Sequence, residues 1–224
     1  MVDDGGPQTQ VPDRRARHRD PSRVAAFTDG VFAIIITILV LEISVPADLP
    51  STGLREALDE VGPTLIAWVI SFGITGTYWV WHRDLFAKIR YADRGIVWLN
   101  LLFLLPTALI PFASALLGEY HGEPVALHVY GVVLIAASLA RTALYGYVVR
   151  NPDLLWEPTV GEDRRVGWYL AAAPIVIYLL AMAVADWSPT LSLLLYLCLP
   201  LLYFLLITVL RSDPETSEGA DDFS

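Results

Sequence analysis

Residues 23–45 read RVAAFTDGVFAIIITILVLEISV, and this stretch decides the fold. Between Val31 and Leu41 it holds only apolar residues and one threonine, which suits a helix that crosses the hydrocarbon core of a bilayer in roughly 20 residues. Five more apolar stretches follow, at about 63–82, 95–118, 125–149, 167–185 and 190–210. The sequence therefore predicts an all-α integral membrane protein with six transmembrane helices.

The composition supports this prediction. Of the 224 residues, 55% are hydrophobic and only 17% are charged, and a soluble domain of this size needs more charges to cover its surface. The single cysteine, Cys198, excludes a disulfide within the chain and a cysteine-based metal site, and its apolar surroundings predict a buried thiol. We find no catalytic or nucleotide-binding motif, so we expect no enzyme activity, no cofactor and no bound metal.

The basic residues predict the orientation. With the N-terminus in the cytoplasm, the inner segments hold 13 of the 15 lysines and arginines, the outer loops hold only Arg55, and Arg141 lies inside the fourth span. Such asymmetry is typical of a multi-pass protein of the cell membrane, here with both termini cytoplasmic. The basic run before the first helix also fits a lipid or nucleic-acid contact, but we interpret it as a topology signal and expect no nucleic-acid partner.

Both ends of the chain differ in composition from the span-containing part. Residues 1–22 are polar and basic, residues 212–224 are polar and acidic, and neither segment has enough apolar residues to form a core. We therefore predict two disordered cytoplasmic tails around a six-helix domain at 23–211. Within that domain, Pro106 and Pro111 should kink the third helix, because each proline removes a backbone hydrogen bond.

Two features of the first helix have more than one explanation. Asp29 falls where the membrane begins, so it is either part of a functional site or a headgroup-level carboxylate stabilised by the helix N-terminus. At about 100° per residue, Ile34, Ile38, Leu41 and Val45 form one stripe with Thr37 at its margin. That stripe fits ordinary helix packing, and it equally fits a hydrophobic constriction that gates a pore by dewetting.

Three blocks of the sequence carry a family resemblance. Residues 23–29 resemble the signature of the transmembrane protein 175 family, an arginine followed after three residues by Phe-Ser-Asp, with Thr28 in place of the usual serine. Further matches lie at the end of the second helix, in YWVWHRDLF (78–86), and in the third helix, in WLNLLF (98–103) and at 111–120. Trp81 and Arg83 stand where bacterial members often have asparagine and histidine.

The resemblance implies a potassium-permeable cation channel in which four six-helix subunits surround a pore lined by their first helices. Rings of apolar side chains would then provide selectivity and gating, and the partners would be further copies of the chain, membrane lipid and the permeant potassium ion. The implied pore-lining residues are Ile34, Thr37, Ile38 and Leu41. The implied polar network comprises Arg23, Phe27, Thr28, Asp29, Trp79, His82 and Asn100.

A secondary transporter or a proton pathway is the alternative. Such proteins often carry paired carboxylates within the membrane, and many are built from inverted repeats. We find neither feature in this sequence, so the channel is the favoured prediction.

Overall fold

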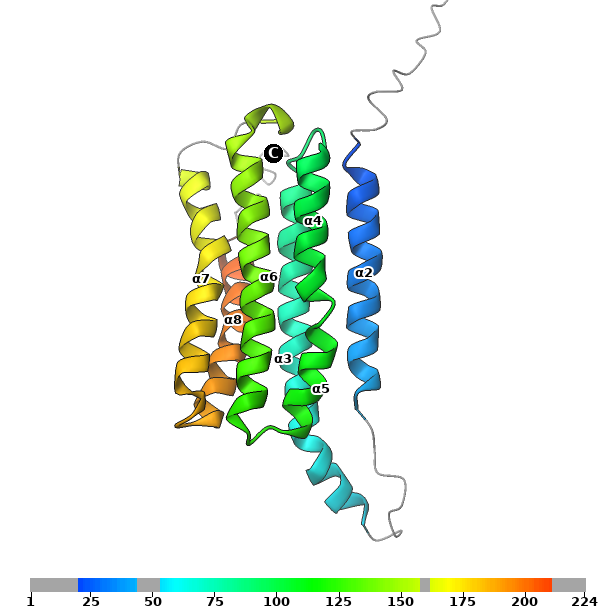
Figure 1. Ribbon diagram of the computed structural model, residues 1–224, viewed down its shortest axis with the longest axis vertical. Coiled ribbons are helices and arrows are strands. Elements are labelled where there is room, and N and C mark those ends of the chain that lie inside the picture. Colours follow the sequence, from blue (N-terminus) through cyan, green and yellow to red (C-terminus); the bar gives the residue numbers. More distant parts are fainter. Residues whose placement is uncertain (1–19, 44–52, 158–161, 211–224) are drawn as a thin grey trace, which may run out of the picture.

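The computed structural model of the protein describes residues 20–43, 53–157 and 162–210, and within these ranges the chain is helical and contains no strand. The helices run up and down beside one another (Figure 1). They are α2 (Ser22–Leu41), α3 (Leu54–Phe86), α4 (Arg94–Thr107), α5 (Ile110–Glu119), α6 (Pro124–Arg150), the short 3-10 helix η1 (Pro152–Leu154), α7 (Glu162–Ala185) and α8 (Pro189–Leu210). The predicted disordered tails fall almost entirely outside the described residues.

Six apolar segments correspond to the six predicted spans. Five are long and apolar enough to cross a membrane: α2, the Val61–Phe86 part of α3, α4 together with α5, α6, and the Arg164–Ala185 part of α7. The sixth is α8, whose Pro189–Tyr203 part is a shorter apolar helix. The six-helix prediction is confirmed.

The third span is divided into two helices. Helix α4 ends at Thr107 and α5 begins at Ile110, so the interruption lies between Pro106 and Pro111. Pro111 has no N–H to donate to the carbonyl of Thr107, which ends the hydrogen-bond ladder of α4 at this point. Pro111 is itself well placed in the first turn of α5, where a missing N–H costs little.

The helix that contains the second span begins earlier than the span itself. We expected a start at Pro63, but α3 begins at Leu54 and projects beyond the rest of the bundle (Figure 1). Pro63 leaves the carbonyl of Asp59 without its helical donor, and Asp59 lies on an exposed turn where water is available instead. A proline near this end is therefore compatible with a continuous helix.

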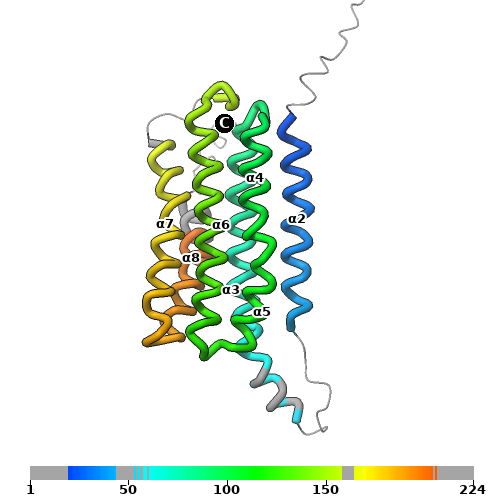
Figure 2. Tube along the Cα trace, viewed as in Figure 1, coloured from blue at the N-terminus to red at the C-terminus, as the bar shows by residue number. Residues whose placement is uncertain are grey.

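Helix α2 lies at the edge of the bundle and packs against α3, α4 and α5 (Figure 2). Helix α3 also packs against α5 and α8, while α6 packs against α4 and α7. Only 22% of the residues in the apolar window of α2 are buried within the subunit, compared with 50% for α6. Most residues in the apolar window of α2 are therefore exposed or only partly covered by the subunit.

The position of Cys198 differs from the prediction. We predicted a buried thiol, but Cys198 lies on an exposed surface of α8. Hydrophobic neighbours in sequence do not imply burial in a membrane protein, because residues facing lipid are as apolar as those facing the core.

The end of the bundle predicted to face the cytoplasm, here called the inner end, is tied together by backbone hydrogen bonds. The N–H of Arg90, after α3, donates to the carbonyl of Leu154 at 2.7 Å. The N–H of Trp156 donates in turn to the carbonyl of Lys88 at 3.1 Å. These bonds fix the loop after α3 to the segment that follows α6.

Candidate functional site

The predicted stripe of α2 is exposed on the single subunit. Ile34 is 58% exposed, Ile38 is 38% exposed and Leu41 is 76% exposed, and Thr37 is also exposed. The opposite side of the helix is buried against the neighbouring helices through Phe32, Ile35 and Leu39. Helix α2 therefore has one face buried in its own subunit and a second face that the subunit leaves largely exposed. Val45 lies outside the described residues.

Thr37 is the one polar residue between Asp29 and Glu42, apart from the backbone. Its hydroxyl is 2.9 Å from the carbonyl oxygens of Ala33 and Ile34 and donates to the backbone of its own helix. A hydroxyl in this position keeps an oxygen lone pair facing outward while its hydrogen is occupied. The exposed face of α2 is consequently apolar with a single weak acceptor.

A buried polar cluster lies at the inner end of α2. The side-chain amide of Asn100 in α4 donates from Nδ2 to the hydroxyl of Thr28 at 2.8 Å. Its Oδ1 lies 2.9 Å from Nε2 of His82 in α3, and because an amide oxygen only accepts, Nε2 of His82 carries the hydrogen. All three residues are almost completely buried, so one cluster joins α2, α3 and α4.

Aromatic rings surround this cluster. The ring of His82 stacks on Phe86 with centroids 4.1 Å apart, and on Phe103 at 6.3 Å. Phe32 of α2 packs against Phe103 at 6.1 Å. These rings exclude water from the hydrogen bonds of the cluster, which strengthens them and makes the loss of any partner costly.

The charged residues of the predicted network behave differently. Arg23, Phe27 and Asp29 are exposed, and among the described residues the ion pairs within 4.0 Å join only Arg83 to Asp84 and His128 to Asp186. Asp29 instead accepts a hydrogen bond from the indole N–H of Trp79 at 2.9 Å. Of the implied polar network, Arg23 and Asp29 thus lie outside the buried cluster, and Asp29 is joined to Trp79 instead. The functional roles of these residues stay predictions.

Sequence reasoning did not assign the surroundings of Arg141. Its side chain is 2% exposed and donates to the carbonyl oxygens of Leu170 at 2.9 Å and Ala171 at 3.1 Å in α7. Pro174 has no N–H, so the carbonyl of Leu170 lacks its helical donor and Arg141 replaces it. The sequence feature that could have predicted this contact is an arginine within one span followed by a proline within the next.

The guanidinium of Arg141 also lies against two aromatic rings of α3. It is 5.3 Å from the ring centroid of Tyr78 and 5.1 Å from that of Trp81. Cation–π contacts of this kind stabilise a desolvated cation in place of a carboxylate. Arg141 is thus an internal connection among α3, α6 and α7, away from the exposed face of α2.

The described residues form no candidate metal site. They contain no group of three or more histidine, cysteine, aspartate or glutamate side chains arranged to hold an ion. The features left for function are the exposed apolar face of α2 and the polar cluster that fixes its inner end.

Comparison with known proteins places these features in context. A family model described as "Endosomal/lysosomal potassium channel TMEM175" matches residues 23–111, which cover α2 from its second residue, all of α3 and α4, and the first two residues of α5. A potassium channel of Streptomyces collinus is 42% identical over 146 residues, covering 63% of this chain and 70% of the relative. A protein of Gallus gallus named "Endosomal/lysosomal proton channel TMEM175" is 37% identical over 136 residues, covering 55% of this chain and 27% of the relative.

A solved structure agrees with the fold. The crystal structure of a lysosomal potassium-selective channel TMEM175 homolog from Chamaesiphon minutus superimposes with a TM-score of 0.73 at 29% sequence identity. The match covers 83% of this chain and 96% of that chain, so it includes helices on both sides of the break between α4 and α5.

Proposed function

Because the chain belongs to the TMEM175 family of ion channels, we propose that four copies of it form a potassium-permeable pore lined by the exposed face of α2. The protein is a multi-pass membrane protein of a channel family, not an enzyme. We place it in the cell membrane with both termini in the cytoplasm, as the distribution of basic residues predicts.

The observation that carries the proposal is the exposure of Ile34, Ile38 and Leu41 on one side of α2. Lipid would cover such a face equally well, and the family of the chain is what favours a pore. In a fourfold arrangement each of these positions contributes four apolar side chains to one ring. Rings of this kind gate by dewetting and offer a passing ion no carbonyl oxygens.

The same rings provide a basis for selectivity. An ion that crosses a narrow apolar ring must keep its water or lose it without replacement ligands. Potassium holds its hydration shell less tightly than sodium does, so potassium crosses at the lower cost. The preference should be weaker than that of a carbonyl filter, which replaces the lost water with oxygen ligands.

The experiment is measurement of reversal potentials across planar bilayers that contain the purified protein, under potassium and sodium gradients. Ile34→Asn supplies oxygen ligands and water to the proposed ring, so it should raise conductance and move the reversal potential toward sodium permeability. Ile36→Asn, on the other side of the helix by about 160°, should do neither. Val40→Asn is a control for exposure, because Val40 is 49% exposed but lies about 120° from Ile34.

Equal shifts for Ile34→Asn and both controls would contradict the assignment of the α2 face to a pore. A strictly monomeric protein that still conducts would contradict the oligomeric pore itself. A proton gradient in the same apparatus tests the second candidate, proton permeation, which is favoured by the similarity to the Gallus gallus protein named a proton channel.

A further inference from the structure

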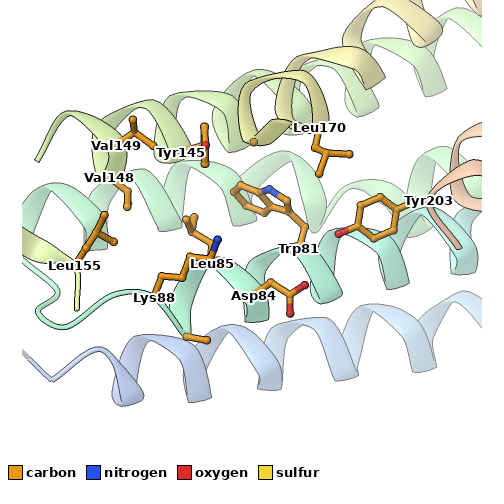
Figure 3. A pocket seen from close by; sticks show the side chains of 12 residues that line it. Trp81, Asp84, Leu85, Lys88, Tyr145, Val148, Val149, Leu155, Leu170 and Tyr203 are labelled. Atoms are coloured by element: carbon orange, nitrogen blue, oxygen red, sulfur yellow. The ribbon is translucent and has the colours of Figure 1, made fainter. Parts of the chain in front are cut away.

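A groove lies at the inner end of the bundle, away from the exposed face of α2. It is bounded by α3, α6, α7 and α8 and has a volume of about 380 Å³ (Figure 3). Its walls are mostly apolar, and they include Leu85 of α3, Val148 of α6 and Leu170 of α7. Figure 3 shows the ring of Trp81 between α3 and α6, and Tyr203 reaching the groove from α8.

The charges around the groove favour an anion. Lys88 lines it just beyond the last residue of α3, and in the described part of the chain Lys88 has no acidic group within 4.0 Å. Asp84 also lines the groove, but its carboxylate is paired with Arg83 at 3.0 Å. Behind Trp81 lies the guanidinium of Arg141, whose partners are carbonyl oxygens and aromatic rings rather than a carboxylate.

The position of the groove along the spans defines the shape of its ligand. Trp81, Tyr145 and Leu170 belong to apolar spans, so this part of the groove lies at the level of lipid acyl chains. Lys88 lies just outside the Val61–Phe86 span, at the level of the phosphates. A matching ligand is anionic at one end and apolar along the rest.

We propose that this groove binds one anionic phospholipid per subunit, with the phosphate at Lys88 and an acyl chain along the apolar walls. Basic pockets between transmembrane helices on the cytoplasmic side commonly bind acidic headgroups. A soluble phosphate would interact with Lys88 but would leave the walls formed by α6 and α7 uncovered. The ligand therefore comes from the bilayer.

The test is titration of the purified, delipidated protein with phosphatidylglycerol or phosphatidylcholine, followed by native mass spectrometry. The unaltered protein should bind phosphatidylglycerol more tightly, and Lys88→Gln should weaken that binding about fivefold with no effect on phosphatidylcholine. Lys88 is exposed, so its replacement does not endanger folding. Arg90→Gln is the matched control, since Arg90 stacks on Tyr91 and Trp156 and does not line the groove.

A second variant tests the apolar part of the site. Val149 lines the groove and is half-buried, so Val149→Trp should fill the space for the acyl chain and weaken the binding of phosphatidylglycerol. Equal weakening by Lys88→Gln and Arg90→Gln would overturn the proposal, because it would show only general attraction to the interface. Unchanged phosphatidylglycerol binding in Val149→Trp would overturn it as well. Neither measurement involves ion flux, so the outcome is independent of the proposed pore.

Discussion

Replacement of Asn100 by leucine should destabilise the protein more than its size change suggests. Asn100 donates to Thr28 and accepts from His82, and both partners are buried. Within the described residues neither partner has a second side-chain hydrogen bond to replace the lost one. The variant therefore leaves two buried polar atoms without a partner. Each such atom costs about 1–3 kcal/mol, so the free energy of unfolding should fall by about 2–6 kcal/mol.

A double variant separates this cause from general disruption of packing. Thr28→Val leaves one buried atom unpaired, Nδ2 of Asn100, and should cost about 1–3 kcal/mol. When both replacements are present, Nε2 of His82 is the one group of the cluster left without a partner. The double variant should therefore be more stable than Asn100→Leu alone, although it carries one more replacement. Thr28→Ser keeps the hydroxyl and should stay near the unaltered protein.

The assay is the loss of the folded particle on heating in detergent, followed by fluorescence-detected size-exclusion chromatography. For a chain of this length, Asn100→Leu should lower the midpoint temperature by an amount on the order of 10 °C. Additive losses in the double variant would refute the reasoning, because they would show that Thr28 and Asn100 contribute independently.

Two further predictions follow from other parts of the structure. Arg141→Met should lower the free energy of unfolding by about 1–3 kcal/mol, because the carbonyl of Leu170 loses its donor. The loss should be smaller in a Pro174→Ala background, where residue 174 regains an N–H for that carbonyl. Equal losses in both backgrounds would exclude this explanation. In a chain whose native thiol is replaced by serine, an impermeant thiol reagent added to intact cells should label a cysteine at Gly122 but not one at Glu218, and labelling at Glu218 would overturn the predicted topology.

The sequence predicts the spans well because the bilayer imposes a length and a composition on each of them. It also predicts the location of the break in the third span, since Pro106 and Pro111 each remove a helical hydrogen bond. The start of α3 is missed because the turn before Pro63 is too polar for a span, although it is a good helix outside one. Hydropathy measures transfer into lipid, and it is insensitive to a helix that continues into water.

The candidate site is predictable from the sequence only in part. The resemblance brings Thr28, His82 and Asn100 together, and the structure joins them by hydrogen bonds. The two charged members of the implied network, Arg23 and Asp29, form no ion pair within 4.0 Å in the described part of the chain, and the carboxylate accepts from the indole N–H of Trp79. Opposite charges near the membrane surface gain little from one another in water, so geometry decides the partner.

The two polar anchors of α2 explain why its apolar stripe faces away from the subunit. Thr28 and Asp29 are adjacent, so their side chains leave the helix about 100° apart, and they bind different helices: Asn100 of α4 and Trp79 of α3. Two bonds in different directions fix the rotation of α2 about its axis, which a single bond would not do. Ile34 then lies about 120° from Thr28 and about 140° from Asp29, and it has to face outward. The face formed by Phe32, Ile35 and Leu39 is buried in the same orientation, so its packing and the hydrogen bonds at the inner end together direct the stripe away from the subunit, toward the proposed pore.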